Sequence, residues 1–275
     1  MELMTAERPR LVAIDLDGTL LRSDGTISPR TVAALDLVDR SGARFVFITG
    51  RPPRYVTELF ATFGYKGLAV CANGALTWDA GRQVVLAEKL IPPATLAAAA
   101  ARWRQAIPGI GIAVEYPDGQ LRDDIYRPGP WGGPPDEMLC VPDGELFARD
   151  AMKLLGRHPT LSADELLTLG APATSGIVAT YHSGGVRLLE ATALGVDKGT
   201  AVAAVAAGLG IPASAVAAFG DQVNDLPMLA WAGHSYAMGN AHPAVLAQAA
   251  RIAPTNDEDG VAVVIERWFA GAASG

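Results

Sequence analysis

Near its start the chain carries the stretch LVAIDLDGTL, residues 11–20, in which an apolar run ends at two aspartates. Four consecutive apolar residues, 11–14, are typical of a short strand that is buried on both faces of a parallel sheet. Asp15 and Asp17 follow at once, so both carboxylates are expected just beyond the carboxyl end of that strand. The stretch therefore predicts a buried first strand with a pair of acids at its end.

The same pattern of a buried run followed by polar residues recurs along the chain. Ser28 and Pro29 predict a helix N-cap and first helical position, and the next apolar run, residues 45–48, ends at Thr49. A third run, residues 68–72, ends at Asn73. From residue 197 the rhythm returns, with helices expected at 198–209, 225–232, 243–250 and 257–269 and strands at 215–219 and 235–238. Alternating strands and helices are the signature of a doubly wound α/β sheet.

The middle of the chain breaks this rhythm. An Ala-rich helix is expected around residues 94–101, and Pro- and Gly-rich turns and short segments follow up to about residue 187. We therefore expect a mostly parallel, Rossmann-like α/β core made of residues 1–86 and 188–275, with an inserted α+β domain at residues 87–187.

Composition restricts the partners of the protein. The 275 residues include 22 Lys and Arg against 29 Asp and Glu, a net charge of −7, and half of them are hydrophobic, which excludes a disordered chain. Without a run of basic residues, nucleic acid and acidic membrane surfaces are not expected as partners, and a small molecule is. Cys71 and Cys140 are too few for a disulfide framework, which fits a cytoplasmic protein. The oligomeric state stays open.

The polar residues at the strand ends suggest the chemistry. In open α/β sheets ligands bind outside the carboxyl ends of the strands, and here those ends carry Asp15, Thr49, Asn73, Asp221 and Asn240. Two carboxylates as close as Asp15 and Asp17 repel each other unless a cation, a proton or a hydrogen-bond donor compensates, and Mg²⁺ is the natural hard cation. An Asx-type turn would explain part of the segment. The whole set suits a divalent cation and a phosphate.

Residues 15–19, DLDGT, resemble the first motif of the haloacid dehalogenase (HAD) superfamily of phosphohydrolases. Further segments agree with that family in order: ITGR at 48–51, DKG at 197–199 and GDQVND at 220–225, with NGA at 73–75 resembling the Cof-type subgroup. The long insertion lies after the third strand, which resembles the C2-capped arrangement of subclass IIB, so the inserted domain is expected to be a cap that determines substrate specificity.

The resemblance implies a role for each acid. Asp15 would be the nucleophile that forms an aspartyl-phosphate, and Asp17 would protonate the leaving group and then deprotonate water. Mg²⁺ would be held by Asp15, the backbone carbonyl of Asp17 and Asp221, with Asp225 at the same site. For Asp225 and its neighbour Asn224, the alternative is an N-cap of the following helix.

The resemblance also implies a set of phosphate- and substrate-binding residues: Thr49, Gly50, Arg51, Asn73, Lys198 and Asn224. The Thr49 hydroxyl and the Gly50 amide would bind a phosphoryl oxygen beside the start of a helix. Taken alone, Thr49 could instead be an N-cap, and Arg51 could contact substrate or only cap its loop. Lys198 stands at a helix start, where a cation needs an anionic partner.

The function expected is Mg²⁺-dependent hydrolysis of a small phosphomonoester, such as a sugar phosphate, through an aspartyl-phosphate. Two alternatives stay open. A phosphosugar mutase would use the same chemistry with a cap that retains the phosphorylated intermediate, and a phospholigand-binding regulator would keep the fold without turnover.

Overall fold

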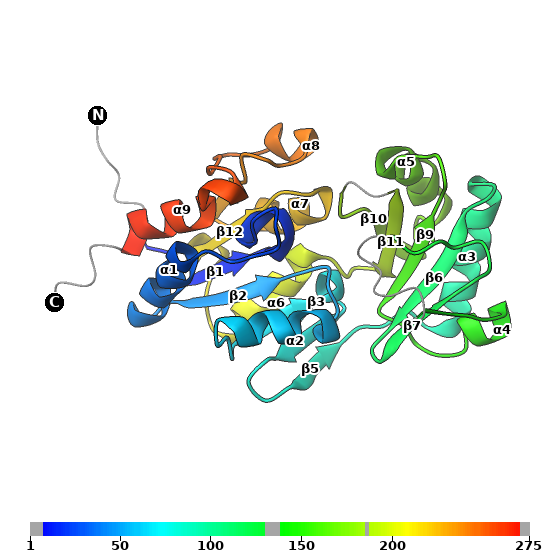
Figure 1. Cartoon of the computed structure of the whole chain (residues 1–275), viewed down its shortest axis with the longest axis horizontal. Helices are drawn as coiled ribbons and strands as arrows, with labels where there is room; N and C mark the ends of the chain where they lie inside the picture. The colour runs from blue at the N-terminus through cyan, green and yellow to red at the C-terminus, as the bar shows by residue number, and fades with distance from the viewer. Residues whose placement is uncertain (1–7, 130–137, 185–186, 270–275) are drawn as a thin grey trace.

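The computed structural model describes residues 8–129, 138–184 and 187–269, which form two sheets with their helices (Figure 1). The first sheet has the strand order β13-β12-β1-β2-β3-β4-β5 and the second β10-β11-β9-β6-β7-β8. We call residues 90–195, which hold the second sheet, the cap, and the remainder the core. The strands of the core are β1 (Leu11–Ile14), β2 (Arg44–Ile48), β3 (Leu68–Cys71), β4 (Leu76–Asp79), β5 (Val84–Glu88), β12 (Val216–Gly220) and β13 (His234–Ala237).

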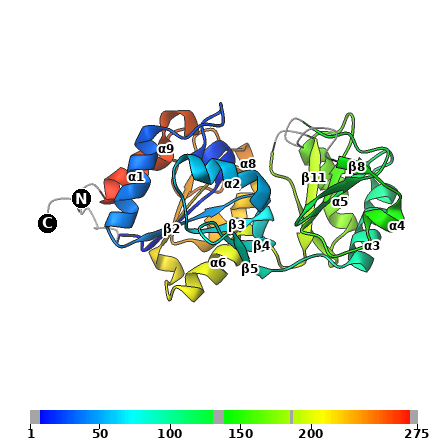
Figure 2. The ribbon, with the colours of Figure 1, turned by 60° about the horizontal axis from the view of Figure 1, so that its bottom comes forward.

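The first strand lies at the centre of the core sheet, as its apolar run predicts. β1 pairs in parallel with β12 on one side and β2 on the other. Val12 and Ile14 pack into one layer with α1 (Pro29–Arg40), α2 (Pro53–Thr62) and α9 (Gly260–Phe269). Leu11 and Ala13 pack into the opposite layer with α6 (Lys198–Gly208) and α7 (Leu226–Trp231). Figure 2 shows α1 and α6 on opposite sides of the core sheet. The doubly wound α/β core is confirmed.

The cap is a mostly antiparallel sheet with helices on one face, so the expected α+β insertion is confirmed. Its strands are β6 (Gly111–Tyr116), β7 (Gly119–Arg122), β8 (Met138–Cys140), β9 (Lys153–Arg157), β10 (Val178–Tyr181) and β11 (Leu188–Ala193), and its helices are α3 (Pro93–Ala106), α4 (Asp143–Leu146) and α5 (Ala163–Ala173). Among the described strands of the cap, only β7 and β8 pair in parallel. Trp103 of α3 is fully buried in the apolar layer with Leu154 and Leu189. The opposite face of the sheet carries Glu115, Lys153 and Glu190, and all three are buried.

The boundaries of the insertion differ from the expected residues 87–187. β5 of the core sheet runs on to Glu88, and β11, which begins at Leu188, pairs with β9 and β10 in the cap sheet. The expected core segment 188–275 therefore includes a cap strand. β4 and β5 form an antiparallel hairpin that the sequence does not predict, because β5 is exposed along its whole length and has no apolar and polar alternation.

Two helices differ from expectation. α8 spans only Pro243–Leu246 instead of reaching residue 250. The last helix begins at Gly260 rather than 257, because a 3₁₀ turn over Asn256–Glu258 ends at Asp259, which has the left-handed φ of 57°. The expected N-cap of α1 is confirmed, since the Ser28 hydroxyl accepts a hydrogen bond from the Thr31 amide at 3.0 Å. No helix of the described residues is long and apolar enough to cross a membrane.

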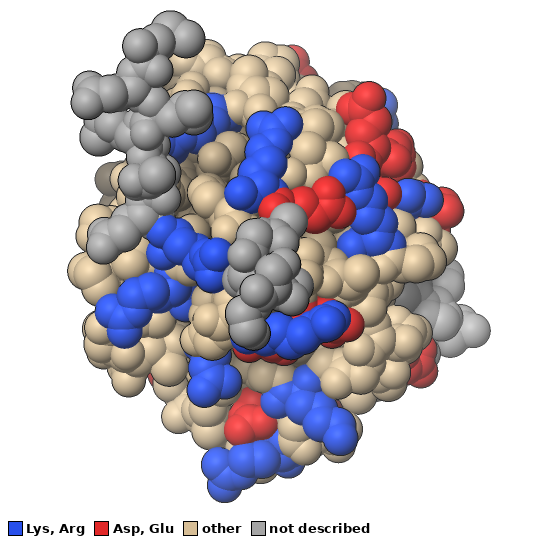
Figure 3. Space-filling view, turned by 90° about the vertical axis from the view of Figure 1, so that its left-hand side faces the viewer, with Lys and Arg blue, Asp and Glu red and all other residues tan. Residues whose placement is uncertain are grey.

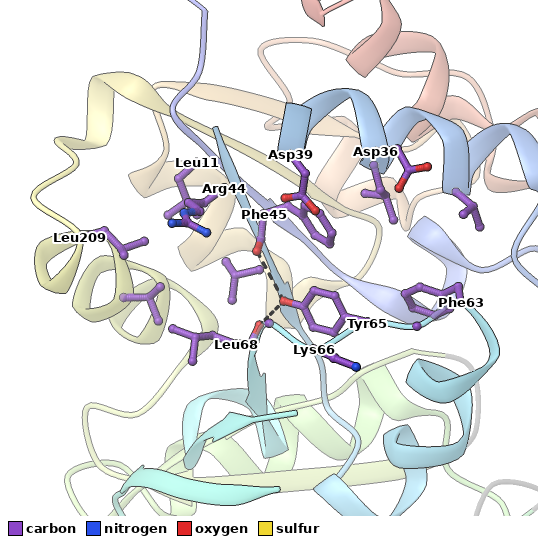
Figure 4. Close-up of a pocket in the computed structure, with 16 residues that line it drawn as sticks. Leu11, Asp36, Asp39, Arg44, Phe45, Phe63, Tyr65, Lys66, Leu68 and Leu209 are labelled. Atoms are coloured by element: carbon purple, nitrogen blue, oxygen red, sulfur yellow. Dashed lines mark hydrogen bonds between the residues drawn. The ribbon is translucent and has the colours of Figure 1, made fainter. Parts of the chain in front are cut away.

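The end of the core remote from the cap carries basic side chains and a cavity, in contrast to the acidic strand ends that face the cap. Lys and Arg side chains gather there (Figure 3), among them Arg8, Arg10 and Arg44. A cavity of about 460 Å³ opens at this end between β2, β3 and α1. The Tyr65 hydroxyl lies in it and donates to the carbonyl of Leu68 at 2.5 Å (Figure 4). This cavity lies at the amino ends of the strands, on the side opposite to the predicted chemistry.

Candidate active site

The polar residues predicted at the strand ends come together between the core and the cap. Asp15, Thr49, Asn73 and Asp221 follow β1, β2, β3 and β12, and each is at most 4 % exposed. Asn240, in contrast, lies at the exposed margin, where its side chain donates to the Gly18 carbonyl at 2.8 Å. Parallel strands that end at one edge bring these residues into one site, as the topology predicts.

Lys198 links two of the carboxylates. It is the first residue of α6, and its ammonium donates to Asp15 Oδ1 at 2.6 Å and to Asp225 Oδ1 at 2.5 Å. Burial opposes its charge, but Asp15 and Asp225 outweigh burial and raise the pKa of Lys198. For Asp15, burial and the neighbouring Asp225 and Asp221 raise the pKa well above its usual value, although Lys198 acts in the opposite direction. The anionic partner expected for Lys198 is therefore present.

Asp221 is held by donors from two loops. Its Oδ1 accepts from the Thr19 hydroxyl at 2.8 Å and its Oδ2 from the Gln222 amide at 2.7 Å. Burial and then Asp225 raise the pKa of Asp221 to about 6. Gly18 passes close beside this carboxylate with a φ of +75°, and a Cβ there would lie 2.5 Å from Asp221 Oδ2. Glycine is required at this point of the loop.

Asp225 organises the loop that carries Asp221. Its Oδ2 accepts the backbone amides of Asp221 and Gln222, both at 2.9 Å, while its Oδ1 binds Lys198. It precedes α7, but its side chain makes no cap hydrogen bond to that helix. Asp225 thus occupies the N-cap position of α7, but its side chain binds the loop before the helix rather than the helix itself.

Three carboxylates form a cluster that could hold a cation. One oxygen from each of Asp15, Asp221 and Asp225 lies within 4.8 Å of the others, and all three residues are buried. Oxygen donors only are the ligand set of hard cations such as Mg²⁺. Three buried carboxylates face the single ammonium of Lys198, and burial together with repulsion between them raises the pKa of Asp15 and Asp221, so the residues fit a divalent cation.

The Asp17 side chain stands apart from this cluster. It is 49 % exposed and forms a bidentate ion pair with Arg51, whose Nε and Nη2 lie 2.8 and 2.5 Å from its two oxygens. Arg51 is therefore placed beside the predicted acid and base. The carboxylate of Asp15, in comparison, makes no hydrogen bond to cap the turn that follows it, so the Asx-turn alternative is wrong for Asp15.

Thr49 and Gly50 form the loop between β2 and α2. Thr49 is fully buried, and its hydroxyl oxygen accepts the Arg51 amide at 3.0 Å. The N-cap of α2 is Pro52, so the alternative interpretation of Thr49 as a helix cap is wrong. A Cβ at Gly50 would lie 3.2 Å from Asn73 Oδ1, which shows how closely the loop packs against the end of β3.

Asn73 and Asn224 connect the core to the cap. Asn224 donates to Asn73 Oδ1 at 2.9 Å and to the Ser183 hydroxyl at 3.1 Å, and Asn73 donates to the Tyr181 hydroxyl at 2.9 Å. The Oδ1 atom of Asn224 is buried without a hydrogen-bond partner among the described residues. It is an acceptor available to a ligand.

Sequence reasoning missed the residues that the cap contributes. Lys153 donates to the Gly50 carbonyl at 3.0 Å and to Glu190 Oε2 at 2.7 Å, and Glu115 pairs with Arg54 of α2. The available signal was a charged residue next to apolar runs, KLL at 153–155 and LLE at 188–190. That signal indicates a buried charge, but not which core residue it meets.

Sequence comparisons relate the chain to known hydrolases. A family model of haloacid dehalogenase-like hydrolases matches residues 12–110 and 148–265. A similar protein is 5-amino-6-(5-phospho-D-ribitylamino)uracil phosphatase YcsE of Bacillus subtilis, 27 % identical over 94 % of this chain and 95 % of that protein. Another is an HMP-PP phosphatase of Klebsiella pneumoniae, 27 % identical over 87 % of each chain.

Solved structures share the fold. SMU.1108c from Streptococcus mutans superimposes with a TM-score of 0.82 at 23 % identity, over 95 % of this chain and 99 % of that one. The HAD subclass IIB sugar phosphatase BT4131 superimposes with a TM-score of 0.77 at 21 % identity, over 94 % and 98 %. The family model covers most of the chain, and its matched residues include the carboxylate cluster and Lys198. The chain therefore belongs to the haloacid dehalogenase-like hydrolases.

Proposed function

We propose that the protein hydrolyses a small phosphomonoester with Mg²⁺ and an aspartyl-phosphate intermediate on Asp15. The observation that carries this proposal is the buried contact of Asp15 with Lys198, at 2.6 Å, within a carboxylate cluster at the strand ends and beneath the cap. A buried carboxylate beside a fixed cation is oriented for attack, and the cap can exclude water while it reacts.

Mg²⁺ would be held by Asp15, Asp221 and the backbone carbonyl of Asp17. Asp225 would act through the loop, because its own oxygens already bind Lys198 and two backbone amides. When bound, the ion reduces the repulsion between the attacking carboxylate and the phosphoryl oxygens. Lys198 does the same from the other side, and it keeps Asp15 oriented through Oδ1.

The residues of the chain divide the reaction into two steps. In the first, a carboxylate oxygen of Asp15 forms a bond to phosphorus while the bond from phosphorus to the leaving oxygen breaks, and Asp17 gives its proton to that oxygen. In the second, Asp17 takes a proton from water, the water oxygen attacks phosphorus, and the bond to Asp15 breaks to release phosphate. Thr49 and the Gly50 amide bind phosphoryl oxygens. Arg51, which holds Asp17, keeps this group facing the reaction.

The substrate is proposed to be a small phosphorylated metabolite enclosed by the cap. The similar proteins act, by their names, on a phosphoribitylaminouracil and on HMP-PP, and BT4131 is a sugar phosphatase. The face of the cap that meets the core offers polar groups on Lys153, Tyr181 and Ser183, which suits a polar leaving group rather than an apolar one.

Metal removal tests the proposal. Protein treated with EDTA and then freed of the chelator is expected to lose turnover of p-nitrophenyl phosphate and of sugar phosphates, and added Mg²⁺ should restore both. The Asp221→Asn variant should need more Mg²⁺ for half-maximal rate. Full activity of metal-free protein would overturn the metal assignment.

A further inference from the structure

One peptide group of the phosphate-binding loop, between Gly50 and Arg51, is held at both ends. Its N–H belongs to Arg51 and donates to the Thr49 hydroxyl oxygen at 3.0 Å. Its C=O belongs to Gly50 and accepts from the Lys153 ammonium, also at 3.0 Å. Thr49 is a core residue, whereas Lys153 is the first residue of cap strand β9. A group of the cap therefore determines the orientation of a peptide in the core.

Lys153 itself is fixed within the cap. Its side chain is 8 % exposed and forms an ion pair at 2.7 Å with Glu190, whose side chain is 3 % exposed, on the neighbouring strand β11 (Figure 1). The other oxygen of Glu190 accepts from Ser183, whose hydroxyl oxygen accepts from Asn224 of the core. A buried ion pair is a weak source of stability, because desolvation offsets most of the attraction. Its evident effect here is to orient the ammonium toward Gly50.

The contacts form a polarised chain. An ammonium at the carbonyl draws electron density toward oxygen and makes the N–H of the same peptide a stronger donor. That N–H occupies a lone pair of the Thr49 oxygen. A hydroxyl has one proton to donate. Because the Thr49 oxygen accepts the Arg51 amide, its own proton points away from that amide and is available to a phosphoryl oxygen.

We propose that Lys153 is a positioning residue for phosphoryl transfer, which acts through the Gly50–Arg51 peptide on the Thr49 hydroxyl, and that Glu190 holds it in place. This inference rests on the proposed function of the site. Because the contact joins the cap to the core, it exists only while the cap lies over the core. The Thr49 hydroxyl is therefore oriented for a phosphoryl oxygen when the substrate is enclosed.

A double-mutant cycle tests the route through Thr49. The variants are Lys153→Met, Thr49→Val and the pair of both, each assayed for kcat and KM with p-nitrophenyl phosphate and Mg²⁺ and for inhibition by inorganic phosphate. Each single variant is expected to lose about tenfold or more in kcat/KM, the range of a hydrogen bond to a charged group. In the Thr49→Val background, Lys153→Met should cause little further loss, because its target is gone.

Controls separate this role from a structural one. Lys153→Arg keeps a charged donor and should recover most of the activity, whereas Arg149→Met removes an exposed cap cation that pairs with Asp118 and should act like wild type. Since Lys153→Met leaves Glu190 buried and unpaired, the double variant Lys153→Met with Glu190→Gln removes both charges. It should fold like wild type by circular dichroism and show the same loss of kcat/KM as Lys153→Met.

The results distinguish three cases. Losses that multiply in the Lys153→Met, Thr49→Val pair would overturn the route through Thr49 and indicate direct contact of Lys153 with the substrate. Full activity of the charge-free pair would show that Lys153 has no role in the reaction. Turnover by Asp15→Asn would refute the proposed nucleophile, and so the proposed function, independently of either result.

Discussion

Asp15 and Asp17 are two positions apart in one loop, but their surroundings are different. Asp15 is buried against Lys198, whereas the Asp17 side chain is 49 % exposed and pairs with Arg51. A carboxylate held by a buried cation suits a nucleophile, and an accessible carboxylate suits proton transfer. Both acids could be predicted from DLDGT, but the pairing of Asp17 with Arg51 could not, because those residues are 34 positions apart and on separate strand ends.

The Asp17→Asn variant should separate substrates by leaving group. Without the proton donor, hydrolysis of a sugar phosphate is expected to slow by about 10²–10⁴, the usual contribution of general acid catalysis, while p-nitrophenyl phosphate should lose less because its leaving group departs unprotonated. Steady-state kinetics on both substrates measure the difference. The Asp15→Asn variant is the control, since it should lose both activities, and equal losses for Asp17→Asn would remove its acid role.

Asp221 should make the stability of the metal-free protein depend on pH. Its pKa of about 6 in the folded state exceeds the ordinary value of 3.8, so between about pH 4 and 6 the folded protein keeps a proton that the unfolded chain has lost. Stability from this group is therefore lost as the pH rises through that window, at about 1.4 kcal/mol per unit of pKa difference.

Urea unfolding in EDTA at pH 4.5 and 7 measures this effect. Asp221→Asn lacks the titrating group. The free energy of unfolding of wild type, relative to that of this variant, should therefore fall as the pH rises. Mg²⁺ should stabilise wild type more at pH 7 than at pH 4.5, because protons compete with the ion for the same carboxylate. A difference between the two proteins that does not change with pH would refute the raised pKa.

At the scale of elements, the loop after β1 depends on its glycine. Gly18→Ala places a methyl group 2.5 Å from Asp221 Oδ2 at a φ of +75°, whereas Gly25→Ala, at a φ of +80°, meets nothing within 4 Å. Both variants bear the strain of left-handed backbone, about 1–2 kcal/mol. Only Gly18→Ala should also weaken Mg²⁺ binding. Thermal unfolding and Mg²⁺ titration of the two variants test this, and equal Mg²⁺ affinities would contradict it.

The elements that could be predicted are those with a local pattern. β1, β2, β3 and β12 are apolar runs, and Ser28-Pro29 is a local cap signal. The β4 and β5 hairpin could not be predicted, because β5 is held by backbone pairing with β4 and exposes Val84, Val85 and Leu86. The cap boundary was misplaced for a similar reason, since nothing in LLEATA, residues 188–193, indicates that it pairs with β9.

At the scale of the whole molecule, the carboxyl ends of the core strands meet the polar face of the cap sheet. Contacts that join the two parts at the site include Lys153 with Gly50, Tyr181 with Asn73, Ser183 with Asn224, and Glu115 with Arg54. Gly50, Asn73 and Asn224 lie in motifs that the sequence shows. Arg54 and the cap residues do not, and their contacts depend on how the two sheets face each other. The motifs carry no information on that arrangement. The residues that would select the substrate are therefore harder to predict than those that would react with it.

The two cysteines, one in each part, differ in accessibility. Cys140 on β8 is exposed, whereas Cys71 at the end of β3 is fully buried, and burial raises its pKa to about 12. A thiol reagent should therefore modify one cysteine of the native protein quickly and the other only when the core opens. The rate of the second, slower reaction would report how often the core sheet opens, without any introduced probe. Mg²⁺ together with inorganic phosphate should slow this second reaction. A Cys140→Ser variant, which keeps only the slow phase, identifies the signal, and equal rates for both thiols would refute it.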